Sequence, residues 1–164
     1  MNIDFEGSLK TIDELAAGDL FVMRDNTRRM FGIRATYGAE PAAVILNMAI
    51  KEADPFPCVA TGHFLGEQAL IHLAKAVLVP DFSEAGLDFR SEVADGPGTL
   101  FFSPDRICMR VARRREGFFY VDLKSGEVSS SRPGGIEVPR WSIKLPSKVS
   151  EHQTLLKFDG PSPA

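Results

Sequence analysis

The sequence has few of the residues that mark secreted, disulfide-stabilised or membrane-embedded proteins. It contains two cysteines and one tryptophan among 164 residues, and two cysteines cannot build a disulfide framework. No apolar run reaches the ~18 residues that a membrane-spanning helix needs. The opening residues, MNIDFEGSLK, carry acidic side chains and no apolar signal segment. These absences predict a cytoplasmic protein without a membrane partner.

Familiar catalytic and cofactor-binding motifs are absent as well. The chain has no Gly-x-Ser-x-Gly, Gly-x-Gly-x-x-Gly or Gly-x4-Gly-Lys-Ser/Thr motif. Cys58, His63 and His72 are close in sequence, but their spacing matches no common zinc site. We therefore predict no cofactor and no metal. Cys58 is expected to be a small buried hydrophobic residue, and His72 a hydrogen-bonded core histidine. Alternation along its strand places Cys108 on the outward face, where it could be exposed.

What is present is an ordinary globular composition with an uneven charge distribution. Hydrophobic residues make up 44% of the chain and charged residues 25%, which excludes a largely disordered protein. Twelve phenylalanines indicate a phenylalanine-rich interior. Residues 1–97 carry 8 basic and 15 acidic side chains, whereas residues 98–164 carry 11 basic and 7 acidic ones. The net charge of −3 by itself predicts no nucleic-acid partner.

Glycine and proline turns divide the chain into short apolar segments of β type. Residues 31–36 and 107–112 alternate apolar and polar side chains, which indicates half-buried strands. Residues 8–17 favour a helical turn with Thr11 and Glu14 as a capping box. Residues 64–77 have both helical spacing and strand composition, and we favour strands there. The remaining expected strands are 20–22, 42–48, 58–61, 100–102, 118–123, 128–131 and 141–145.

A motif recurs eighty residues apart, as GDLFV at 18–22 and GTLFF at 98–102. Similar turns and strands follow both copies in the same order, which favours a duplication over the alternative of coincidence. We predict a mainly β protein with two tandem small β-barrel-like (SH3-like) units packed together, after a short N-terminal helical turn. The predicted boundaries are 1–82, 83–146 and a C-terminal tail, 147–164, whose TLLKF segment (154–158) could dock as an edge strand or contact a partner.

An arginine cluster is the main candidate interaction site. Guanidinium groups bind phosphates, and nearby aromatic rings can stack on bases. The alternative is that these arginines are the solvated face of a strand and a hairpin tip. The candidate residues are Arg106, Arg110, Arg113, Arg114 and Arg115, with Arg28 and Arg29 in the first unit.

We predict a non-enzymatic protein-interaction or adaptor module that binds a protein partner or self-associates. The alternative is a nucleic-acid-binding protein that uses the arginine-rich strand 106–115. A third class, an enzyme using Cys108 or His72, would need an assembled catalytic group that the sequence does not display.

Overall fold

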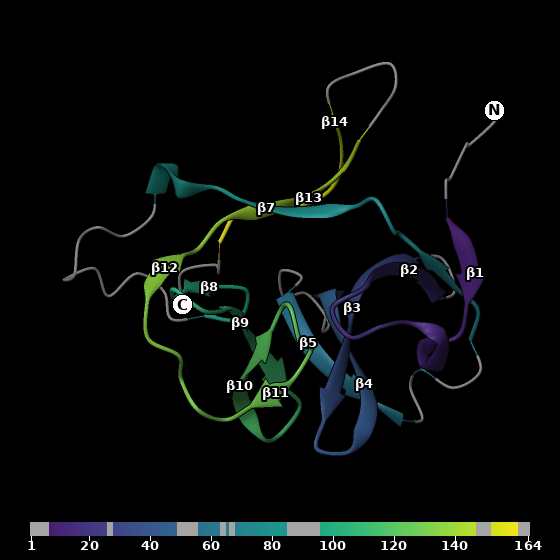
Figure 1. The fold of residues 1–164 in the computed structure, drawn as a ribbon, viewed down its shortest axis with the longest axis horizontal. Helices are drawn as coiled ribbons and strands as arrows, with labels where there is room; N and C mark the ends of the chain where they lie inside the picture. Colours follow the sequence, from purple (N-terminus) through teal and green to yellow (C-terminus); the bar gives the residue numbers. More distant parts are fainter. Residues whose placement is uncertain are drawn as a thin grey trace.

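The chain is built almost entirely of β-strands (Figure 1). The computed structural model describes residues 7–25, 28–48, 56–62, 65, 68–84, 96–146 and 152–160. The prediction of a mainly β protein is confirmed. Of the helical turn predicted over 8–17, only Ile12–Glu14 is helical, as the 3-10 turn η1, and Ser8–Lys10 forms strand β1 instead. A second 3-10 turn, η3 (Phe82–Glu84), follows β7 (Val77–Pro80).

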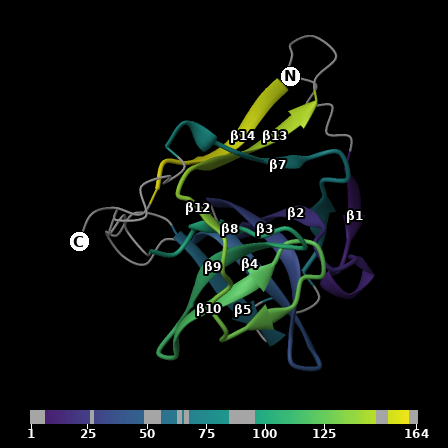
Figure 2. The same cartoon turned by 60° about the vertical axis from the view of Figure 1, so that its left-hand side comes forward.

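The described strands form two sheets. The smaller sheet contains β7 (Val77–Pro80), β13 (Trp141–Pro146) and β14 (His152–Phe158), and it lies across one side of the larger sheet in both views (Figures 1 and 2). The larger sheet contains β1 (Ser8–Lys10), β2 (Leu20–Asp25), β3 (Arg28–Tyr37), β4 (Glu40–Met48), β5 (Phe56–Thr61), β6 (Leu70–His72), β8 (Leu100–Phe102), β9 (Ile107–Arg113), β10 (Gly117–Asp122), β11 (Val128–Ser129) and β12 (Ile136–Val138).

The two halves of the chain follow the same path. In the first half, β2, β3, β4 and β5 pair antiparallel in succession, and β6 returns to pair with β2. In the second half, β8, β9, β10 and β11 pair in succession, and β12 returns to pair with β8. The strands that come next, β7 and β13, pair with each other in the smaller sheet.

The two Gly-x-Leu-Phe motifs form the same β-bulge. Gly18 donates its N–H to the carbonyl of Arg34 (2.8 Å), and Arg34 donates back to the residue after the glycine (2.9 Å). Gly98 and Arg110 repeat both bonds, at 2.7 and 2.8 Å. The glycines have φ values of 87° and 101°, which side chains with a Cβ rarely adopt. The bulges therefore explain both glycines, and they make Arg34 and Arg110 equivalent in position.

Contacts between the halves come in a matched pair. Cys58 of β5 lies beside Ala112 of β9 in a parallel arrangement. Thr36 of β3 lies beside Glu127, just before β11, also in parallel. Thr36 and Ala112 each stand two residues after an equivalent arginine. β5 thus pairs with β9, and Glu127 forms a single bridge to β3. The sheets do not close into the barrels that the sequence predicted.

One hydrophobic core is shared by the two halves and the small sheet. Ile33 and Val44 of the first half pack in the same cluster as Met109, Trp141 and Ile143 of the second. A separate cluster lies under η1 in the first half, and a smaller one formed by Phe101, Cys108 and Tyr120 lies in the second.

Within the ambiguous segment 64–77, residues 70–72 and Val77 are in strands, as favoured, whereas 73–76 form a turn. Residues 64, 66 and 67 lie outside the described residues. The predicted docking of 154–158 is also observed, because β14 pairs antiparallel with β13. Trp141 donates its indole N–H to the carbonyl of Gly98 (2.8 Å) and stacks on Phe158, with ring centroids 5.1 Å apart. The end of β14 is therefore part of the shared core.

Candidate interaction surface

Four apolar side chains gather at one end of β8, β9 and β12 and are here called the β8 patch: Phe82, Phe102, Ile107 and Ile136. Ile136 lies opposite Phe102, and Phe102 lies opposite Ile107, so these three point to the same face of the sheet. The ring of Phe82 lies 5.2 Å from that of Phe102. Phe82, Ile136 and Ile107 are 55%, 48% and 38% exposed. The structure thus exposes a contiguous apolar surface there.

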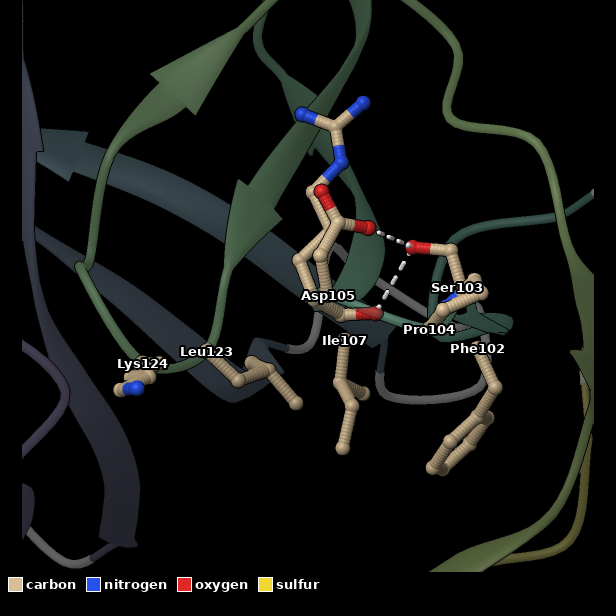
Figure 3. A pocket seen from close by; sticks show the side chains of 8 residues that line it. Phe102, Ser103, Pro104, Asp105, Ile107, Leu123 and Lys124 are labelled. Atoms are coloured by element: carbon tan, nitrogen blue, oxygen red, sulfur yellow. Dashed lines mark hydrogen bonds between the residues drawn. The ribbon is translucent and has the colours of Figure 1, made fainter.

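A shallow depression of about 420 Å³ adjoins this patch (Figure 3). Phe102, Ile107 and Leu123 supply its apolar lining, and their side chains point to the same side in Figure 3. Arg106 and Lys124 also line it, and both are exposed. An apolar floor with charged side chains at its margin is the usual composition of a protein contact surface.

The loop between β8 and β9 holds the patch in place. Ser103 donates its N–H to the carbonyl of Arg106 (3.0 Å), and its hydroxyl contacts the same carbonyl (3.0 Å) and the carboxylate of Asp105 (3.1 Å). This leaves Pro104 and Asp105 as a two-residue hairpin loop. The turn fixes the register that sets Phe102 opposite Ile107.

Phe102 and Leu123 also pack against the shared core. The buried neighbours of Phe102 on the same face include Leu100 and Val138, which are fully buried. The β8 patch is therefore the exposed end of the main core rather than a set of isolated surface residues.

The structure does not bring the seven candidate arginines together at one site. Arg28 and Arg29 lie at the start of β3, whereas Tyr37, at its other end, lies under the guanidinium of Arg113 (4.0 Å from the ring centroid). Arg106 precedes β9, and Arg110 is buried within it. The exposed hairpin tip after β9 contains Arg114 and Arg115, the latter at φ 68°.

Arginines in the second half largely contact their own chain. Arg110 lies over the ring of Phe118 (4.2 Å to the centroid), and Arg113 pairs with Glu116 (2.7 Å). In the first half, the equivalent Arg34 donates from Nε to the carbonyl of Ile12 (3.1 Å) and so fastens η1. The interaction role of the arginines stays a prediction.

Cys108 is buried, so the expectation of an exposed outward face was wrong. The aromatic rings of Phe101 and Tyr120 cover that face of β9. Burial raises the pKa of Cys108, with a further contribution from Asp122, and burial also raises the pKa of Cys58. Both thiols are free, and these buried groups are poor nucleophiles.

His72 is half-buried, and its Nε2 lies 3.3 Å from the carboxylate of Asp19, in line with a hydrogen-bonded histidine. His63 lies outside the described residues. Within the described ranges, no group of three His, Cys, Asp or Glu side chains could hold a metal ion. No helix in the part of the chain that the structure describes is long and apolar enough to cross a membrane.

Sequence reasoning did not single out the β8 patch. The alternation of 107–111 placed Ile107 with Met109 and Val111 in the interior, and the face is correct. Ile107 is nevertheless exposed because it lies at the end of the strand, where the core ends. Phe82 lies between Asp81 and Glu84 in the sequence, and this acidic context was the one feature that indicated an exposed ring.

Comparison of the chain with models of protein families, with curated proteins and with solved structures yields no match.

Proposed function

We propose that the chain is a non-enzymatic protein-interaction module built from two related small, SH3-like β units, and that the β8 patch is its contact surface. The observation that carries this proposal is the contiguous exposure of Phe82, Ile107 and Ile136 around Phe102.

The relation between the units is supported by three independent features. Both halves have the same strand order, from β2 to β6 and from β8 to β12. Both begin with the same bulge, at Gly18 and Gly98. The pairs that join them, Cys58 with Ala112 and Glu127 with Thr36, use equivalent ends of β9 and β3. Coincidence would have to produce all three features together.

Protein binding is favoured over nucleic-acid binding by the placement of the side chains. Nucleic-acid binding needs cations that track a phosphate backbone. Arg28 and Arg113 lie toward opposite ends of β3, and Arg110 and Arg113 contact rings of their own chain. The apolar side chains of the β8 patch, in contrast, are contiguous and lie beside a depression.

Site-specific photocrosslinking tests the proposed contact surface. A photoreactive phenylalanine analogue at position 107, in cells that produce the protein, should give a discrete crosslinked product of higher mass. The matched control is position 77, because Val77 is exposed to a similar degree (45%) but lies on β7. A product at both positions, or at neither, would contradict the proposal.

A further inference from the structure

Two turns that line the depression beside the β8 patch each carry a cationic side chain. Arg106 comes directly before β9, and Lys124 lies between β10 and β11. Both side chains are exposed, and neither forms an ion pair with another described residue. They line the same depression as the apolar side chains of Phe102, Ile107 and Leu123. Two free cations are therefore held beside an apolar surface.

The turn that carries Lys124 is fixed by its neighbours on three sides. Asp122 accepts a hydrogen bond from the N–H of Lys124 (2.8 Å), and Leu123 donates its N–H to the carbonyl of Ile107 (2.9 Å). The bulge of the first half lies against the same turn, because a Cβ on Gly18 would come within 2.9 Å of the carbonyl oxygen of Leu123. The backbone of Lys124 is thus held in place before any partner binds, which lowers the entropy cost of binding.

The charges that line the depression do not cancel. Among the described residues of its lining, Asp105 is the acidic one, and its carboxylate lies 3.1 Å from the hydroxyl of Ser103, which donates to it. The backbone of Arg106 is fixed by the same turn, since its carbonyl accepts the N–H of Ser103 (3.0 Å). Two cations against one carboxylate attract an anionic group. The apolar lining, in contrast, favours an apolar group.

We infer that the depression binds a segment of a partner protein in which an apolar side chain stands next to a carboxylate. The apolar side chain would lie on Phe102 and Ile107, and the carboxylate would face Arg106 and Lys124, because guanidinium and ammonium groups form charge-assisted hydrogen bonds with carboxylates. This inference rests on the proposed function and specifies the chemistry of the partner at the β8 patch.

The extent of the apolar surface favours a protein segment over a small anion. A free phosphate or carboxylate would contact the two cations but would leave the apolar lining uncovered. The β8 patch also continues beyond the depression, because Ile136 and Phe82 adjoin Phe102 and are both exposed. A partner that covers this patch while one acidic side chain meets Arg106 and Lys124 uses both features together.

The test is an amide-resolved NMR titration of the full chain with the peptide acetyl-Gly-Asp-Phe-Asp-Gly-amide. The peptide should shift the amide signals of Ile107, Leu123 and Lys124. The control peptide, acetyl-Gly-Asn-Phe-Asn-Gly-amide, has the same shape without the charges and should bind about threefold more weakly or worse. Arg106→Glu and Lys124→Glu should each weaken binding of the acidic peptide by about threefold or more. Arg114→Glu is the matched control, because it reverses an exposed arginine that does not line the depression, and it should retain binding.

The outcomes separate this inference from the proposed function. Equal affinity for the two peptides, or an equal loss in Arg114→Glu, would overturn the acidic chemistry while leaving the β8 patch as a contact surface. Shifts confined to other parts of the chain, no binding at all, or a dimer of this chain that buries Ile107 would also overturn the inference. The crosslinking experiment at position 107 judges the proposed function independently. If a charge-reversal variant does not fold, the comparison of the two peptides on the unmodified chain decides.

Discussion

Glu14 fixes the 3-10 turn η1 through hydrogen bonds to Thr11, the residue just before the turn. Its carboxylate accepts a hydrogen bond from the N–H of Thr11 (2.7 Å), as the predicted capping box requires, and a further one from the hydroxyl of Thr11 (3.0 Å). These bonds lower the pKa of Glu14 below its ordinary value of 4.5, the backbone bond contributing most. The turn positions Ile12, which is buried over the core of the first half.

Glu14→Gln should therefore lower the urea midpoint at neutral pH. Because the pKa of Glu14 is lower in the folded chain, its contribution is present above the unfolded-state value and is lost as the pH falls through the folded-state value. The difference between the two proteins should shrink as the pH drops below 4.5. Urea titrations at several pH values measure it. Asp13→Asn, in the same turn, is the control. A difference that persists in acid would contradict this assignment.

Single residues also show where sequence reasoning stops. The alternation of Ile107, Met109 and Val111 gave the correct face for each residue of β9. The alternation could not predict which of these side chains are buried, because burial depends on the neighbouring elements that cover each face of the strand. Rings from β8 and β10 cover Cys108, whereas Ile107 is 38% exposed and no ring of the described residues buries it in the same way. The residue expected outside is therefore buried, and one expected inside is exposed.

At the scale of the element, β14 shows how a terminal strand stabilises the shared core. Its last residue, Phe158, stacks on Trp141 at an interplanar angle of 18° and occupies the space beside the backbone of Gly98. A side chain on Gly98 would collide with that ring. The bulge glycine therefore serves two purposes, since it permits a positive φ and leaves room for β14.

Phe158→Ala should destabilise the protein by about 3–5 kcal/mol, because it removes a buried ring and leaves a cavity beside Trp141. Trp141 is the only tryptophan, so its fluorescence during urea unfolding measures the loss. Lys157→Ala is the matched control on the same strand. Its ion pair with Asp159 is exposed, and the change should cost at most about 1 kcal/mol. Equal effects of the two substitutions would show that β14 is not docked.

Strands were predictable from sequence because turns and alternation are local signals. Segments 31–36, 107–112 and 141–145 lie within β3, β9 and β13. Strand partners were not predictable in the same way. The pairing of β5 with β9, and of β7 with β13, joins segments that are distant in sequence and have no turn between them. The sheets that result are open, although each half alone suggested a closed barrel.

At the scale of the whole molecule, the two halves complete each other. The main core contains side chains from both, and β7 of the first half is paired with β13 of the second over residues 77–80 and 141–144. Residues 1–97 carry more acidic than basic side chains, and residues 98–164 carry more basic than acidic ones. Opposite charges accelerate association at low ionic strength. Burial of the shared core and the opposite charges of the two parts therefore both favour their association.

Fragments 1–82 and 83–164 should therefore fail to fold alone and should fold when mixed. Each fragment separately would expose its side of the shared core, and a domain of that size has little other apolar surface to bury. Circular dichroism should show cooperative thermal unfolding for the mixture but not for either fragment. The fluorescence of Trp141 should change on mixing, because β7 lies opposite Trp141 only in the complex. Cooperative unfolding of either fragment by itself would contradict a shared core and would favour two independent domains.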